Sequence, residues 1–189
     1  MSPGGHLLTT LAACAVSLAA AREAPAGEAL ALAAGVAAGG FLIDVDHAVD
    51  YVLFERQRDL RPGAFLRYYL GGQVRRTVLA LHSYELLALL VAAAWWLEVP
   101  ALTGYVLGAL LHLGLDIAVN GEITPKSIAA FYSFSYRAAH GFDAGRLLGM
   151  QPRPVPAGFW AAFFSLPARW TRRRGEAGGR SVADLPPAS

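Results

Sequence analysis

Residues 101–119 form the apolar run ALTGYVLGALLHLGLDIAV, which contains one histidine, His112, and one aspartate, Asp116. At a rise of about 1.5 Å per residue, this run forms a helix nearly long enough to cross the hydrocarbon core of a membrane, which is about 30 Å thick. Three further apolar windows cover residues 7–21, 29–43 and 77–97. The sequence therefore predicts an all-α fold, an integral membrane bundle of about four transmembrane helices.

The composition of the whole chain agrees with a membrane protein. Of its 189 residues, 55% are hydrophobic and only 16% are charged, against roughly 25% charged in an average soluble protein. The formal net charge of +2 gives no reason to expect direct nucleic-acid binding. The single cysteine, Cys14, excludes an internal disulfide and a cysteine-based metal site. Gly35, Gly39 and Gly40 either allow a close helix contact or merely fill an apolar stretch.

The positions of arginine and lysine predict how the helices are oriented. The connection after the first window holds only Arg22, and the connection after the third window holds no basic residue. The other basic residues lie between the second and third windows or after residue 119. We therefore expect a multi-pass protein of a bacterial-type inner membrane, with both termini and residues 44–76 in the cytoplasm. Trp95 and Trp96 suit the aromatic belt at the opposite face.

Aromatic residues and arginines alternate outside the four windows, a pattern that favours helices lying in the headgroup region. We expect such interfacial helices within residues 44–76, after a cap at Thr124, and again in the aromatic stretch beyond residue 150. Residues 1–150 are then the membrane-embedded domain, and residues 151–174 an aromatic and basic interfacial segment. Residues 175–189, rich in Gly, Ala, Pro and Ser, are expected to be disordered.

Histidines and carboxylates fall near the cytoplasmic ends of all four predicted helices. Spacings of three or four residues place neighbouring members on one helix face. An ionised side chain in hydrocarbon costs at least about 2.5–3.5 kcal/mol, and the windows contain no lysine or arginine to offset that cost. Imidazole and carboxylate groups together suit a divalent metal. The predicted metal ligands are His6, Asp44, Asp46, His47, His82, His112 and Asp116.

This ligand set favours Zn²⁺, with Mn²⁺ or Fe²⁺ as alternatives. Together with Glu85, the three aspartates carry enough negative charge to balance one or two ions. A bound water, its pKa lowered toward about 7, would be the nucleophile, with Glu85 and Asp46 as the predicted catalytic residues. Arg75 and Arg76 either bind a substrate phosphate or anchor the chain at the cytoplasmic face.

The order of these residues resembles a known family. The segment from Gly39 to His47 is similar to the Gly-x-x-x-Pro-Asp-x-Asp-His segment of the membrane-bound metal-dependent hydrolases, the LexA-binding, inner membrane-associated hydrolase family. Ile43 stands where that family has proline. The other matching segments are Arg75-Arg76 with His82-Ser83, the Gly108, His112 and Asp116 helix, and the N-terminal His6. In motif order alone, the chain is also similar to zinc-dependent phospholipase C.

The resemblance covers roughly residues 1–150 and implies a metal-dependent hydrolase. A site this close to the headgroups favours a lipid phosphoester or a related amphiphile as substrate, so membrane lipids are the expected partners. Two alternatives stay open. Intramembrane acids and histidines also mark the pathways of metal or proton transporters, and a non-catalytic membrane scaffold could use the same residues as a structural polar network.

Overall fold

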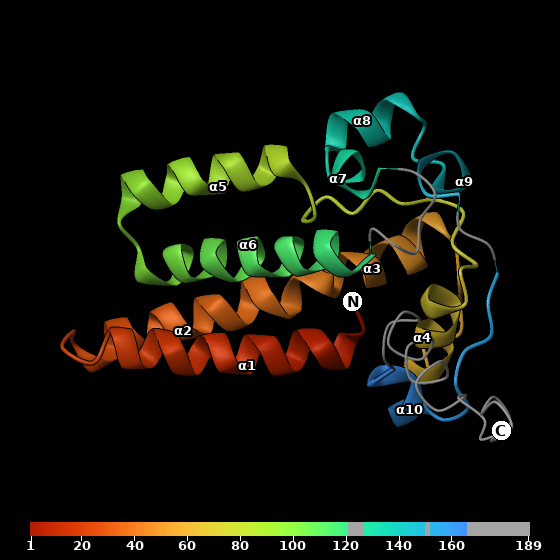
Figure 1. Cartoon of the computed structure of the whole chain (residues 1–189). Helices are drawn as coiled ribbons and strands as arrows, with labels where there is room; N and C mark the ends of the chain where they lie inside the picture. The colour runs from red at the N-terminus through yellow and green to blue at the C-terminus, as the bar shows by residue number, and fades with distance from the viewer. Residues whose placement is uncertain (121–126, 150–151, 166–189) are drawn as a thin grey trace, which may run out of the picture.

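A computed structural model describes residues 1–120, 127–149 and 152–165 of the chain. Within these residues the fold is all-helical, and an isolated bridge between Arg76 and Asp143 is the only strand-like pairing described. The four longest helices lie side by side in the order α5, α6, α2, α1 (Figure 1). Their bounds are Pro3–Ala20 for α1, Ala26–Gly40 for α2, Tyr84–Leu97 for α5 and Pro100–Asn120 for α6. The predicted cap at Thr124 and the predicted tail 175–189 lie outside the described residues.

Two or three of these helices are suited to cross a membrane. Helices α1 and α6 are long and apolar enough, and α2 with residues 42–54 forms a third candidate that is bent by 44°. Helix α5 has 14 residues, fewer than the roughly 20 that a spanning helix needs. The expected membrane association is therefore confirmed. Among the described residues, two or three helices are long enough to span a membrane, whereas four were predicted.

Helices α2 and α6 approach each other closely because glycines lie at their contact. Gly35 and Gly39 of α2 face the backbone of α6, and Gly104 and Gly108 of α6 face the backbone of α2. A Cβ atom added at Gly108 would lie 2.6 Å from a backbone nitrogen of α2. Small residues spaced by four allow this approach in membrane helices. The glycines of the second window thus serve helix contact, and they bring the half of α6 that carries His112 against the end of α2.

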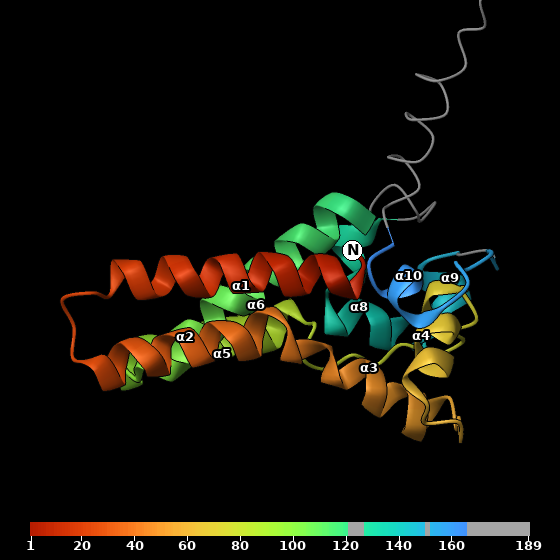
Figure 2. The same cartoon turned by 90° about the horizontal axis from the view of Figure 1, so that it is seen from below.

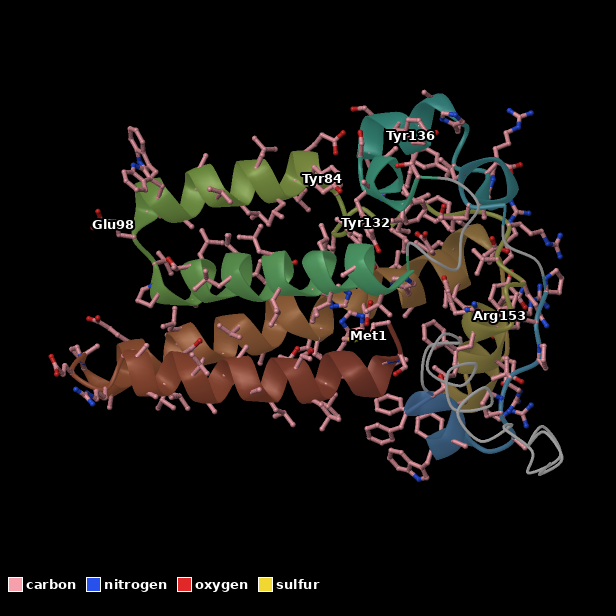
Figure 3. All side chains as sticks on the ribbon, in the orientation of Figure 1. Met1, Tyr84, Glu98, Tyr132, Tyr136 and Arg153 are labelled. Carbon is pink, nitrogen blue, oxygen red and sulfur yellow. The ribbon has the colours of Figure 1, made fainter. Side chains whose placement is uncertain are left out.

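The shorter helices gather at one end of the four long ones (Figures 1 and 2). The turn after α1 and Glu98, which follows α5, lie at the opposite end (Figure 3). The elements of the gathered end are η1 (Leu42–Asp44), α3 (Val45–Val49), η2 (Asp50–Phe54), α4 (Pro62–Leu70), α7 (Ile128–Phe131), α8 (Phe134–Ala139), α9 (Ala144–Leu147) and α10 (Phe159–Phe163). The expected helices of residues 44–76 and of the two later aromatic stretches are present, although they are short.

Residues 75–83 are not helical, and the third helix begins at Tyr84 rather than at Thr77 as predicted. Carboxylates of α3 and η2 bind the backbone N–H groups that a helix would have used: Asp46 accepts from Leu81, Asp50 from Val78 and Leu79, and Glu55, beside η2, from Arg75 and Arg76. Ser83 then caps α5, since its Oγ accepts from Leu86 N at 3.3 Å. His82 therefore lies in a loop before the helix. The prediction that His82 and Glu85 share a helix face is wrong.

Candidate metal centre

Three side chains from different elements present their ligand atoms to one point. Asp44 Oδ1 lies 3.4 Å from His82 Nε2 and 3.5 Å from His112 Nε2, and the two imidazole nitrogens are 3.1 Å apart. Ligands about 2.1 Å from a tetrahedral ion are about 3.4 Å from one another. The triangle of Asp44, His82 and His112 therefore has the dimensions of three ligands to one ion.

The other nitrogen of each of these imidazoles has its own hydrogen-bond acceptor. His82 Nδ1 lies 3.0 Å from Asp46 Oδ2, and His112 Nδ1 lies 2.9 Å from the carbonyl oxygen of Gly40. An acceptor at Nδ1 favours the tautomer that carries its proton there, which leaves the Nε2 lone pair for a metal. Asp46 and the end of α2 thus orient the two histidines. Asp46 contacts the side of the His82 ring that faces away from the triangle.

Asp116 connects a second group to the triangle. Its Oδ1 lies 3.0 Å from His6 Nε2 and 2.7 Å from the amino nitrogen of Met1, while its Oδ2 accepts from the hydroxyl of Tyr132 at 3.0 Å. The His6 ring stacks on the His112 ring with centroids 3.8 Å apart. His6, His112 and Asp116 also lie close enough to share an ion, so helices α1 and α6 meet at this point through their polar groups.

His47 lies at the opposite side of the triangle and is partly exposed. Its Nδ1 is 3.4 Å from Asp44 Oδ1 and 3.3 Å from Asp46 Oδ1. With His82, Asp46 and His47 form a third group that could hold an ion. All seven predicted metal ligands therefore lie in one continuous cluster, and buried groups of histidine and aspartate in it could hold a metal ion.

Two observations test whether the cluster suits a cation. First, His6 Nδ1 is buried and has no hydrogen-bond partner among the described residues, and Asp46 Oδ1 and His47 Nδ1 are buried with only their 3.3 Å ion-pair contact to each other and no hydrogen bond of good geometry, although buried polar atoms normally have one. Second, burial alone lowers the pKa of the His82 imidazole, but contacts with Asp44 and Asp46 outweigh burial and raise that pKa to about 10. The carboxylates therefore favour positive charge here, and the donor set fits a divalent metal.

Glu85, predicted as the general base, is not part of the cluster. Its carboxylate accepts hydrogen bonds from the Ser133 hydroxyl and from the backbone N–H groups of Phe134 and Ser135, at 2.8–3.0 Å. These N–H groups belong to the first turn of α8, where a carboxylate is favourable. Glu85 therefore joins α5 to α8. The cluster holds three aspartate carboxylates, one negative charge fewer than the four that were expected to balance two divalent ions.

A pocket of about 520 Å³ opens beside the cluster. Asp44, His47, His82, His6 and Asp116 line one part of it, and apolar side chains line most of the remainder. The predicted substrate-binding residues do not line it. The side chains of Arg75 and Arg76 are exposed, and their backbone N–H groups bind Glu55. The arginine on the pocket wall is Arg153.

Four important residues were not predicted from the sequence as part of this region: Asp50, Tyr132, Arg137 and Arg153. Asp50 had a usable signal, since it lies one helical turn after Asp46 on an acidic face. Arg137 lies within an aromatic stretch, which indicated an interfacial surface rather than burial. Tyr132 and Arg153 reach the site only through contacts between segments distant in sequence, which no local pattern of residues indicates.

Comparison of the chain with protein-family models, with curated proteins and with solved structures finds no match. The geometry of the cluster and its pocket therefore carries the functional argument.

Proposed function

We propose that this chain is a metal-dependent hydrolase that cleaves a phosphoester in an amphiphilic substrate at the membrane surface. The observation that supports this most strongly is the triangle of Asp44, His82 and His112, whose members have the spacing of ligands to a single ion. The triangle borders a pocket that is large enough for a small molecule. The resemblance of the motif order to membrane-bound metal-dependent hydrolases agrees with this proposal.

A divalent cation bound there, with Zn²⁺ favoured over Mn²⁺ or Fe²⁺, would supply a water of lowered pKa and would polarise a phosphoryl oxygen. Asp44, His82 and His112 would hold it, while Asp46 and the Gly40 carbonyl fix the orientation of the two imidazoles. His47 lines the pocket and contacts two carboxylates. We assign proton transfer to His47, because its imidazole lines the pocket beside the triangle and can both accept and donate a proton.

The distribution of buried polar residues favours a hydrolase over a transporter. Among the described residues, the buried histidines and aspartates all lie at the gathered end of the long helices. At the other end, Arg22 and Glu23 form an exposed ion pair. A relay across the membrane requires ionisable groups along the whole path. Metal flux through the purified protein in proteoliposomes would contradict the hydrolase proposal.

Metal content provides the first test. The purified wild-type protein should contain a divalent metal in stoichiometric amount by elemental analysis, whereas His112→Gln should contain less than about a tenth of it, because one ligand and its tautomer contact are lost. His140→Gln is the matched control, since His140 contacts the Tyr136 carbonyl outside the cluster. Equal metal content in wild type and His112→Gln would refute the site.

The same preparations should show metal-dependent release of product from lipid phosphoesters, restored after chelation by adding the metal back. The His140→Gln control should retain this activity. A metal-containing protein with no metal-dependent turnover of any lipid phosphoester would leave the metal site intact but would refute the hydrolase proposal.

We also propose that α5 is a fourth span and that the gathered end faces the cytoplasm of a bacterial-type inner membrane. The concentration of arginines at that end supports this orientation, as do the exposed Trp95 and Trp96 at the other end. In a Cys14→Ser background, Trp96→Cys should react with an impermeant maleimide in intact spheroplasts, and Arg58→Cys only after lysis. The reverse pattern would overturn the orientation.

A further inference from the structure

The pocket beside the cluster is mainly an apolar chamber. Most of its apolar wall comes from the bend after α2 and from helices α4, α7 and α10, and the start of α1 and residues 74–82 complete it. The apolar lining residues include Phe41, Leu42, Phe65, Leu66, Phe131 and Phe163. A small phosphate ester would contact only the cluster and would leave these side chains without a partner. The lining therefore points to a ligand with a long apolar part.

Helix α10 separates this pocket from the surroundings and is apolar on both sides. Phe159 and Phe163 line the pocket, while Trp160 and Phe164 are 68% and 45% exposed. The helix lies against α4 and against the start of α1, where Phe164 contacts Gly4 (Figures 1 and 2). Exposed aromatic side chains next to a membrane-spanning helix are suited to the lipid interface. The pocket is thus bounded toward the membrane by a wall compatible with lipid.

Arg153, which is exposed, lines the same chamber and adds a positive charge to it. Its Nε donates to the carbonyl oxygen of Leu70 at 2.7 Å, and its backbone N–H donates to Gly71 at 3.2 Å. These contacts hold the side chain at the end of α4, and its two terminal nitrogens have no partner among the described residues. Arg153 is also the one arginine or lysine among the described residues that line the pocket. A guanidinium with free donors is well suited to bind a phosphate or phosphonate.

We propose that the pocket binds a single-chain amphiphile from the membrane, with its apolar chain against α4 and α10 and its phosphate group held by Arg153. This inference rests on the proposed function only for the assignment of the phosphate as the reacting group. The chain-binding and anion-binding parts depend on the pocket itself, and they can be tested without metal and without turnover.

The first experiment uses chelator-treated protein in nanodiscs of neutral lipid and a dodecyl phosphonate with a diazirine at the chain end. After photolysis, mass spectrometry should find adducts on α4 and α10 residues of the pocket. Unlabelled dodecyl phosphonate should compete for these adducts. Labelling confined to outward-facing residues such as Leu8 and Leu11 would overturn the proposal.

A pair of tryptophan variants tests whether the chamber itself binds the chain. Leu42 is 60% exposed and lines the pocket, whereas Leu89 is 68% exposed and lies outside the pocket lining on α5. Leu42→Trp narrows the chamber and should reduce pocket labelling by at least about tenfold, while Leu89→Trp should leave it unchanged. Both side chains are exposed, so both variants should fold. Equal labelling of the two variants would contradict chain binding in this pocket.

A second pair tests the role of Arg153. Arg153→Gln should weaken competition by dodecyl phosphonate about tenfold or more, as expected for loss of a charge-assisted hydrogen bond. It should not change competition by dodecanol, which lacks the anion. Arg58→Gln, an exposed arginine outside the pocket lining, is the control. Equal weakening for dodecyl phosphonate and dodecanol would show that Arg153 shapes the chamber but does not bind the anion. Failure of the hydrolase assay alone would leave these results unaffected.

Discussion

Replacing Gly108 by alanine should lower the free energy of unfolding by about 1–3 kcal/mol, the usual cost of inserting a carbon atom into a fully packed contact. The added Cβ would lie 2.6 Å from the backbone nitrogen of Gly40 on α2. Backbone atoms cannot move aside as a flexible side chain can, so α2 and α6 must separate. Because His112 follows Gly108 by one turn and contacts the Gly40 carbonyl, the same variant should also lose metal.

Gly114→Ala is the matched control, because Gly114 lies in the same helix and a Cβ there would meet no atom within 4 Å. Alanine is favoured over glycine in a helix by about 0.5–1 kcal/mol, so this variant should be as stable as wild type or slightly more stable. The two glycine substitutions are therefore predicted to change the free energy of unfolding in opposite directions. Denaturant-induced unfolding in mixed micelles, followed by circular dichroism, measures both. Equal stability of the two variants would show that α2 and α6 do not depend on the glycine contact.

Replacing Arg137 by methionine should lower the free energy of unfolding by at least about 3 kcal/mol. The guanidinium is fully buried and donates to three carbonyl oxygens, those of His82, Leu79 and Phe131, each at 2.9 Å. Hydrogen bonds to charged groups contribute about 1.5–3 kcal/mol each, and methionine would remove this donor from all three buried carbonyls. The Leu79 carbonyl would keep the backbone N–H of His82 as a donor. Two of these carbonyls belong to the loop that presents His82, so the variant should also bind metal more weakly.

Arg58→Met serves as the control for this substitution, since Arg58 is exposed and its loss should leave stability unchanged. Arg137→Lys keeps the charge, but a single ammonium group cannot donate to all three carbonyls as the planar guanidinium does. Its free energy of unfolding should lie between those of Arg137→Met and the wild type. Thermal unfolding and elemental analysis on the same samples give both measurements. If Arg137→Met unfolds at the wild-type temperature, the loop must be held by the carboxylates of α3 and η2 alone.

The apolar helices and the membership of the histidine and aspartate cluster could be predicted because both depend on residue type and local spacing. Apolar windows such as residues 101–119 impose helices in a bilayer, and uncompensated histidines and aspartates inside them require partners. The start of α5 could not be predicted in this way. Residues 77–83 are apolar enough to continue the helix, but carboxylates more than twenty residues earlier bind their N–H groups.

The roles of individual charged residues also depended on distant contacts. Glu85 has the spacing of an active-site acid but binds the first turn of α8, 48 to 50 residues later. Arg75 and Arg76 have the position of phosphate ligands but lie outside the pocket, and Arg153 lines it instead. A side chain's type and local spacing leave several partners open, and the packing of the chain selects among them.

The sequence by itself determined that this protein has helices apolar enough to span a membrane and that seven histidine and aspartate residues gather at one end of them, because hydrocarbon tolerates such residues only when they are paired. The tertiary structure alone decided which atoms face one another, which acids act as structural caps, and where an apolar pocket opens beside the cluster. These features depend on contacts between segments far apart in the chain, such as the glycine contact of α2 with α6 and the carbonyls bound by Arg137.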